Sequence, residues 1–127
     1  MDRQEYKSNA PWEDKLGYCR AVKVGQIIEV AGTTSVNDFG QTIGDNYFDQ
    51  ANFILNKIEK ALQNFETDRN SITRTRIYVL DIEKWEEVAR AHSAFFSKHK
   101  PVCTLVEISK LIQKDLLIEI EVSAILN

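Results

Sequence analysis

The sequence predicts an α+β domain in which two amphipathic helices cover one face of a mixed β-sheet. Two stretches repeat apolar residues at three- and four-residue steps, which places those residues on one face of a helix. Other stretches alternate apolar and polar residues, as strands do when one of their faces is buried. The length of 127 residues matches one ordinary domain, and 43% hydrophobic with 28% charged residues is a globular composition. We therefore expect residues 1–127 to form a single domain.

The N-terminal part is expected to start irregularly and then to form two short strands. Residues 1–14 are predicted to be an irregular arm, because this stretch is polar and Pro11 interrupts it. Strands are predicted over residues 18–24 and 26–33, and Gly25 makes the turn between them.

The first helix is predicted over residues 45–65, after a loop at residues 38–44 that contains two glycines. Asp45 has the side chain of an N-cap residue. The apolar residues that share one helix face are Phe48, Ala51, Leu55, Ile58, Leu62 and Phe65.

The second half of the chain is predicted to contain three more strands and one more helix. Residues 71–81 alternate as a strand does, and residues 82–98 carry a second apolar stripe at helical spacing, which Pro101 ends. Residues 102–108 and 116–125 are predicted to be the closing strands. The apolar stripe of the second helix consists of Trp85, Val88, His92, Phe95 and Phe96.

The sheet face away from the helices is predicted to be chemically mixed. Two helices cover only one face of a sheet of this size, so the other face must meet solvent or another molecule. An oligomer interface with paired charges would explain this mixture, and so would a solvated face with surface ion pairs. The alternation assigns to this face Arg74, Arg76, Glu107, Glu119 and Glu121, together with the apolar Leu105 and Leu117.

Composition and motifs argue against several classes of protein. The formal net charge is −3 and the basic residues are scattered among acids, so nucleic-acid binding is not expected. No apolar run approaches the ~18–20 residues of a membrane span, and residues 1–10 do not form a signal peptide. The two cysteines, Cys19 and Cys103, do not have CxxC spacing. Together these observations predict reduced thiols and a cytoplasmic protein without a membrane partner. His92 and His99 lack a third ligand, so no metal and no cofactor are expected.

Six segments, in their order along the chain, together resemble one known family. They are KLGYCRAVKVG at residues 15–25, IIEVAGT at 27–33, TRTRIYVLD at 73–81, AFF at 94–96, PVCTLVE at 101–107 and LIEIEVSA at 117–124. This set resembles the reactive intermediate deaminase (RidA, or YjgF-type) family. The resemblance implies a homotrimer whose sheets line a central barrel, in the chorismate mutase-like arrangement, with ligand clefts between neighbouring subunits.

The resemblance also implies a site. Well-known members hydrolyse reactive enamines and imines to 2-keto acids and ammonia. By position, the glutamate that positions water is Glu119 and the tyrosine of the first strand is Tyr18. The small residue and glycine that end the second strand include Gly32, and the signature segment places Cys103, Thr104 and Leu105 at the ligand. The chain departs from the family at Cys103, because that position carries the arginine that holds the substrate carboxylate.

Two arginines are candidates to replace the missing one. Arg20 lies two residues after Tyr18, so their side chains share one face of the first predicted strand. Arg76, on the mixed sheet face, is the second candidate. In the alternative interpretations, Arg20 pairs with an acid such as Glu29 at the surface and Glu119 pairs with a strand arginine. Likewise, Tyr18 only packs, Cys103 is a buried inert thiol, and the histidines are structural.

These observations lead to three hypotheses of function. The first is a trimeric small-metabolite-binding protein that hydrolyses imines or enamines other than simple 2-imino acids. The second is a non-catalytic ligand-binding or regulatory trimer. The third, an endoribonuclease, ranks last.

Overall fold

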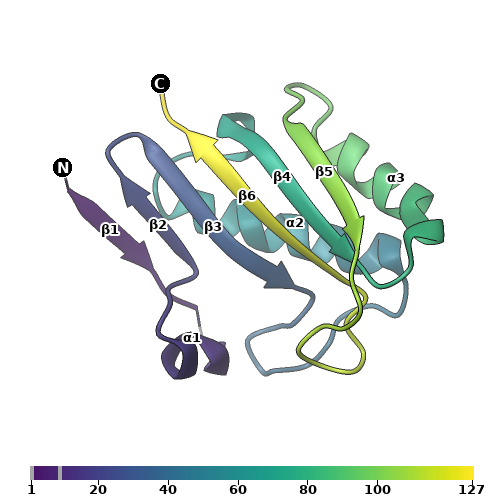
Figure 1. Cartoon of the computed structure of the whole chain (residues 1–127). Helices are drawn as coiled ribbons and strands as arrows, with labels where there is room; N and C mark the ends of the chain where they lie inside the picture. Colours follow the sequence, from purple (N-terminus) through teal and green to yellow (C-terminus); the bar gives the residue numbers. More distant parts are fainter. Residues whose placement is uncertain (1, 9) are drawn as a thin grey trace.

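The computed structural model describes residues 2–8 and 10–127. Its fold is a six-stranded sheet with two long helices on one side and one short helix at an end (Figure 1). The strands are β1 (Arg3–Tyr6), β2 (Ala21–Val24), β3 (Ile27–Thr34), β4 (Ile72–Val79), β5 (Val102–Glu107) and β6 (Ile118–Ile125). The helices are α1 (Pro11–Leu16), α2 (Tyr47–Gln63) and α3 (Trp85–Phe95), with short 3₁₀ turns at Arg69–Ser71 and Ile82–Lys84.

The sheet is mixed, as the sequence predicts. Its strand order is β1-β2-β3-β6-β4-β5, and all neighbours are antiparallel except β4 and β5. A parallel pair needs a crossover, and α3 supplies it. The last strand of the chain, β6, therefore lies in the middle of the sheet, while β1 and β5 form its two edges.

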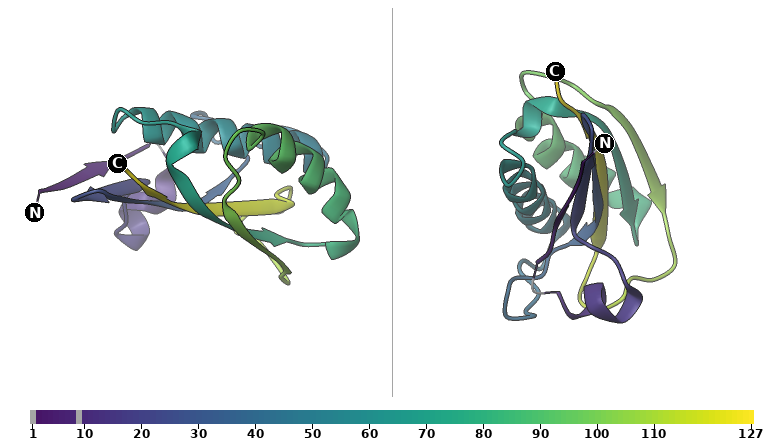
Figure 2. Two further views of the ribbon diagram at one scale, coloured as in Figure 1. Left: turned by 90° about the horizontal axis from the view of Figure 1, so that it is seen from above. Right: turned by 90° about the vertical axis from the view of Figure 1, so that its left-hand side faces the viewer.

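Helices α2 and α3 cover one face of the sheet (Figure 2). Helix α2 begins at Asn46, whose side-chain oxygen accepts a 2.8 Å hydrogen bond from the Asp49 amide, so the N-cap lies one residue after the predicted Asp45. No helix among residues 2–8 and 10–127 is long and apolar enough to cross a bilayer. The core between helices and sheet includes Ile28, Val30, Ala51, Ile54, Leu55, Ile58, Leu62, Ile77, Val79, Val88, Ile118, Ile120 and Val122.

The N-terminal segment is more ordered than predicted. Instead of an irregular arm, residues 3–6 form the edge strand β1 and residues 11–16 form α1. Pro11 starts this helix rather than interrupting the chain, because a first-turn residue needs no amide hydrogen for the helix. Gly17, at φ 78°, ends α1 in the left-handed conformation that glycine adopts without strain. Strand β2 consequently starts at Ala21, three residues later than predicted.

The open face of the sheet carries polar pairs but differs from the prediction at β5. Arg76 lies opposite Glu121, and Tyr78 lies opposite Glu119, all with half-buried side chains. Leu105 and Glu107, however, were assigned to this face wrongly. The parallel register pairs them with the buried Ile77 and Val79, so they share the helix side of the sheet. Glu107 accepts a 3.0 Å hydrogen bond from the Ile82 amide, whereas Val102, Thr104 and Val106 face the open side.

Candidate functional site

A bulge in β3 creates the centre of the candidate site. The register between β3 and β6 shifts between Val30 and Thr33, and such irregularities bend a strand and redirect its side chains. Gly32 lies within the shift, and a Cβ atom there would fall 2.2 Å from Oε2 of Glu119. The Glu119 carboxylate therefore occupies the space that a side chain at residue 32 would need.

A cavity of about 320 Å³ opens beside this carboxylate. Four predicted site residues line it: Tyr18, Arg20, Gly32 and Glu119. They come from the segment before β2, from the β3 bulge and from β6, so the fold brings Tyr18 to Glu119, which follows it by 101 positions. The other lining residues are Ala10, Trp12, Leu16, Ala31, Thr34, Lys57 and Ile112.

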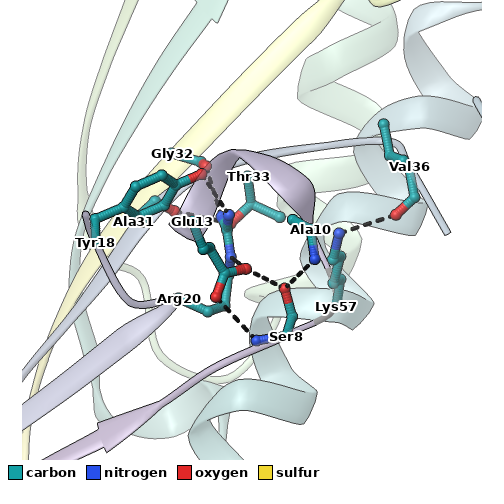
Figure 3. A network of polar contacts seen from close by, with 10 residues as sticks. All are labelled: Ser8, Ala10, Glu13, Tyr18, Arg20, Ala31, Gly32, Thr33, Val36 and Lys57. Atoms are coloured by element: carbon teal, nitrogen blue, oxygen red, sulfur yellow. Dashed lines mark hydrogen bonds and ion pairs between the residues drawn. The ribbon is translucent and has the colours of Figure 1, made fainter. Parts of the chain in front are cut away.

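Arg20 is the organising residue of one cavity wall (Figure 3). Its Nη1 donates hydrogen bonds to the Gly32 carbonyl oxygen at 2.7 Å and to Thr33 Oγ1 at 3.2 Å. Its Nη2 donates to the Tyr18 hydroxyl at 3.1 Å. The guanidinium thus satisfies a bulge carbonyl that the irregular ladder leaves free, and it fixes the tyrosine beside the cavity.

The charge of Arg20 is balanced by Glu13, a residue that sequence analysis did not select. Nε of Arg20 lies 3.5 Å from Oε2 of Glu13, and the two side chains are only 5% and 3% exposed. Glu13 also accepts hydrogen bonds from the Ser8 amide, at 3.0 Å, and from the Ser8 hydroxyl (Figure 3). The interpretation that Arg20 pairs with Glu29 at the surface is wrong, because the buried partner comes from α1.

Glu119 contrasts with these bonded groups. Its carboxylate makes no hydrogen bond and no ion pair with the part of the chain that the structure describes, so the predicted alternative of a pair with Arg74 or Arg76 is not formed within one chain. Burial raises the pKa of its carboxyl group, the positive charge of Arg20 opposes this, and the negative charge of Glu121 adds to it. A half-buried carboxylate with a raised pKa and free lone pairs can accept a proton from water.

The remaining predicted site residues lie elsewhere in the chain. Arg76 lines a separate open-face hollow of about 740 Å³ that also contacts Tyr18, Glu29 and Glu121. Cys103 and Thr104 are exposed on the edge strand β5, so Cys103 is not the buried thiol of the alternative interpretation. Leu105 packs against the core on the helix side. One chain therefore does not bring residues 103–105 to the Glu119 cavity.

Gln50 fixes the loop that leads into β6. This fully buried side chain donates 3.0 Å hydrogen bonds to the carbonyl oxygens of Gly44 and Asp115, and it accepts one of 2.9 Å from the Leu117 amide. The loop carries Ile112, which lines the cavity. A single glutamine in α2 thus ties the segment before α2 to the segment before β6.

His92 has structural contacts, as predicted, whereas His99 is exposed. His92 Nε2 lies 2.9 Å from the hydroxyl of the buried Thr75, its ring contacts Phe96, and burial lowers its pKa. No group of three metal-ligating side chains occurs among the residues that the structure describes.

Comparisons with known proteins agree on the family. The family model described as Endoribonuclease L-PSP matches residues 8–126. An uncharacterized protein of Streptomyces coelicolor, SCO2049, is 33% identical over 119 residues, which cover 93% of this chain and 88% of that protein. The 2-iminobutanoate/2-iminopropanoate deaminase of Escherichia coli is 27% identical over 111 residues, covering 85% of this chain and 86% of that enzyme.

Solved structures give the same result for the fold. The crystal structure of Rv2704 from Mycobacterium tuberculosis, a member of the YjgF/YER057c/UK114 family, has a TM-score of 0.90 at 38% identity. It covers 98% of this chain, and this chain covers all of it (100%). The YjgF gene product of E. coli has a TM-score of 0.82 at 26% identity, with 96% and 94% of the two chains covered.

Proposed function

Because the chain belongs to the endoribonuclease L-PSP family, that of the YjgF-type proteins, we propose that it binds small metabolites in clefts between the subunits of a homotrimer and hydrolyses imines or enamines there. The observation that carries this proposal is Glu119, a half-buried carboxylate on a cavity wall with no bonded partner among the described residues and a raised pKa. A carboxylate that served only structure would be paired, as Glu13 is.

A second subunit is proposed to complete the cleft. Strands β6 and β4 separate β5 from β3 in the sheet, so residues 103–105 cannot reach the cavity of their own chain. If β5 of a neighbouring copy covers the cavity, both parts of the predicted site meet. Val102 and Val106 support such a contact, because they are 55% and 41% exposed on the open face and would be buried by it.

The proposed reaction uses Glu119 as the proton carrier. A water molecule gives a proton to the Glu119 carboxylate while its oxygen attacks the imine carbon, and the C=N π electrons and a proton from solvent go to nitrogen. Glu119 then returns its proton to that nitrogen, the C–N bond breaks and ammonia leaves. The hydroxyl loses its proton to solvent and becomes the carbonyl, so the sum is imine plus water to carbonyl compound plus ammonia. An enamine enters as its imine tautomer.

Cys103 limits the substrates that this cleft would accept. A guanidinium holds a carboxylate through two parallel hydrogen bonds, and a neutral thiol cannot replace it. We therefore propose substrates other than the simple 2-imino acids. The same residue favours a second candidate, a non-catalytic ligand-binding trimer. We do not propose ribonuclease activity, because His92 is bonded to Thr75 and the chain is acidic.

Two measurements test the proposal. Light scattering at micromolar concentration should give about three times the 14.6 kDa chain mass, and a stable monomer would contradict the cleft. Imines generated in solution from a panel of amines by an added oxidase should be hydrolysed faster with the protein than with its Glu119→Gln variant, whereas 2-imino acids generated from simple amino acids should be hydrolysed little faster. Equal rates for both, together with ligand binding by the wild-type chain, would favour the non-catalytic candidate.

A further inference from the structure

We propose that a hollow on the helix side of the sheet is a second ligand site, separate from the Glu119 cavity, and that it binds a phosphate ester of a single aromatic ring. The hollow measures about 360 Å³ and lies between β1, the loop after β3 and one face of α2. It does not depend on the imine chemistry proposed for Glu119.

Helix α2 supplies one wall of the hollow. Phe53, Asn56, Lys57 and Lys60 follow one another at three- and four-residue steps, which places their side chains on one helix face. Phe53 and Lys57 are half-buried, whereas Asn56 and Lys60 are exposed at the rim. The face of α2 that packs on the sheet is largely apolar, but this face combines an aromatic ring with an amide and two ammonium groups.

The charge of the hollow favours an anion. Among the residues that the structure describes, three cations line it, Arg20, Lys57 and Lys60, against one acid, Asp38, in a chain whose net charge is −3. Neither lysine lies within 4.0 Å of a carboxylate of those residues. Glu13, which balances Arg20, does not line the hollow. The excess of positive charge would therefore attract a negatively charged ligand.

Free donors around Lys57 match a phosphate group. The Lys57 ammonium donates one 2.9 Å hydrogen bond, to the carbonyl oxygen of Val36 (Figure 3), so two of its three N–H groups have no partner among residues 2–8 and 10–127. The Lys60 ammonium and the Asn56 amide lie on the same helix face and add further donors. A phosphate ester offers three strong acceptor oxygens and close to two negative charges, and lysine binds phosphate well as a point charge.

The electrostatics around Lys57 agree with this assignment. Burial lowers the pKa of Lys57, the nearby positive charge of Arg20 lowers it further, and Asp38 and Glu13 oppose these effects. Arg20 is only 4% exposed, and its Nε has no hydrogen-bond partner among the described residues. A bound phosphate would offset the repulsion between the two cations.

Two aromatic side chains define the rest of the ligand. Tyr6 of β1 and Phe53 of α2 both line the hollow and are both half-buried. Aromatic rings pack favourably on one another in offset or edge-to-face arrangements. A volume of about 360 Å³ is near the lower end of the range for ligand pockets, ~300–1,000 Å³, so the hollow suits one ring rather than several.

Three probes test the site. A ligand-observed NMR titration would compare phenyl phosphate with inorganic phosphate, which lacks the ring, and with phenol, which lacks the charge. The wild-type chain should bind phenyl phosphate at least about 10-fold more tightly than either. Lys57→Met should weaken phenyl phosphate binding about 10-fold or more, through the loss of a charged hydrogen bond, and leave phenol binding unchanged. Phe53→Ala should weaken the binding of phenyl phosphate but not of inorganic phosphate.

Control variants separate this site from the Glu119 cavity, because Arg20 and Lys57 line both hollows. Ile112 lines the Glu119 cavity and not the helix-side hollow, and the exposed Lys110 lines neither. Ile112→Ser and Lys110→Met should therefore bind phenyl phosphate as the wild type does. Lys60→Met removes an exposed rim cation, so it can replace Lys57→Met if that variant does not fold.

Several results would overturn the site. One is equal binding of phenyl phosphate and phenol by the wild type, and another is no binding of phenyl phosphate at all. A third is weaker binding by Ile112→Ser together with unchanged binding by a folded Phe53→Ala variant, which would place the ligand in the Glu119 cavity. All three leave imine hydrolysis at Glu119 untouched, because that reaction is measured separately.

Discussion

Two carboxylates near the same arginine have opposite surroundings. Glu13 is almost fully buried, accepts hydrogen bonds from the Ser8 amide and hydroxyl, and pairs with Arg20. The carboxylate of Glu119 is half-buried on the wall of the 320 Å³ cavity and has no bonded partner among the described residues. The fold could have paired Glu119 with Arg20, yet Arg20 pairs with a residue from the N-terminal helix.

The comparison shows how this fold divides structural and chemical roles. A buried carboxylate whose oxygens are all engaged stabilises one conformation, because moving it would leave unpaired charges behind. A partly buried carboxylate without partners costs stability, but its lone pairs stay available to a ligand or to water. The same sequence contains both, and only the contacts around each carboxylate distinguish them.

The largest expected effect is on catalysis at Glu119. Glu119→Gln should reduce imine hydrolysis about 10²–10⁴-fold, the usual contribution of a positioned proton carrier. The variant should be at least as stable as the wild type, because it removes a carboxylate whose pKa burial raises. Turnover assays and urea unfolding at neutral pH check the two parts. A large loss of stability would mean that Glu119 is structural, like Glu13.

At Glu13, by contrast, the expected effect of substitution is a loss of stability. Glu13→Ala should lower the free energy of unfolding by about 3–5 kcal/mol, because it leaves the guanidinium of Arg20 buried without its partner. Urea unfolding measures this, and Arg20→Ala should cost a similar amount. A loss below about 1 kcal/mol for both variants would remove the contrast between the two carboxylates.

Gly32 tests whether the position of the Glu119 carboxylate matters. Gly32→Ala places a Cβ where Oε2 now lies, at 2.2 Å, so the carboxylate must swing away. We expect a loss of activity of about 10²-fold, as displacements near 1 Å can cause. Gly40→Ala is the control, because Gly40 does not line the cavity; its φ of 79° strains an alanine, but activity per folded molecule should be unchanged. Full activity of Gly32→Ala would show that Glu119 needs no fixed position.

Both activity and the effect of Glu119→Gln on stability should depend on pH. The pKa of Glu119 is raised above the ordinary value of 4.5, so its carboxylate is protonated, and activity falls, at a higher pH than for an ordinary glutamate. For the same reason, the free energy of unfolding of Glu119→Gln should exceed that of the wild type. This difference is present at neutral pH and disappears as the pH falls below the ordinary glutamate pKa, where both side chains are neutral. A rate that is constant down to pH 4.5 would contradict this role.

The smallest effect is expected at Glu5, a carboxylate that belongs neither to the buried Arg20 pair nor to the Glu119 cavity. Glu5 pairs with Arg3 on the edge strand, with side chains 44% and 60% exposed. Glu5→Ala should change the free energy of unfolding by less than about 0.5 kcal/mol, because exposed pairs contribute little. A cost comparable to that of Glu13→Ala would show that ion pairs of this protein matter regardless of burial.

Much of the fold could be predicted because periodic patterns report burial directly. The alternation in β6 and the helical spacing in α2 both identified the sides that face the core. The prediction for the N-terminal segment was wrong, because a four-residue strand and a six-residue helix are too short to show a period. Leu105 and Glu107 were misplaced because the face of an edge strand depends on its register with β4, which the strand's own sequence does not contain.

The candidate site was predictable only in part. Resemblance to a family located Tyr18, Gly32 and Glu119, and these residues do share a cavity. Glu13 and Lys57 carry no local signal, since one charged residue in a helix is normally solvent-exposed. Their contacts are tertiary: Glu13 meets Ser8, which precedes α1, and Arg20, which follows it, and Lys57 reaches the Val36 carbonyl.

The place of β6 in the sheet has a consequence for the growing polypeptide. This strand joins β3 to β4 and follows the other five strands in sequence, so the sheet cannot close before residues 118–125 have left the ribosome. Until then, β1 to β3 and β4 to β5 are two separate strand groups, each with an unpaired edge. Because Glu119 lies on β6, its cavity forms only after this strand has been made, and a nascent chain that stops before residue 118 carries neither a closed sheet nor a site.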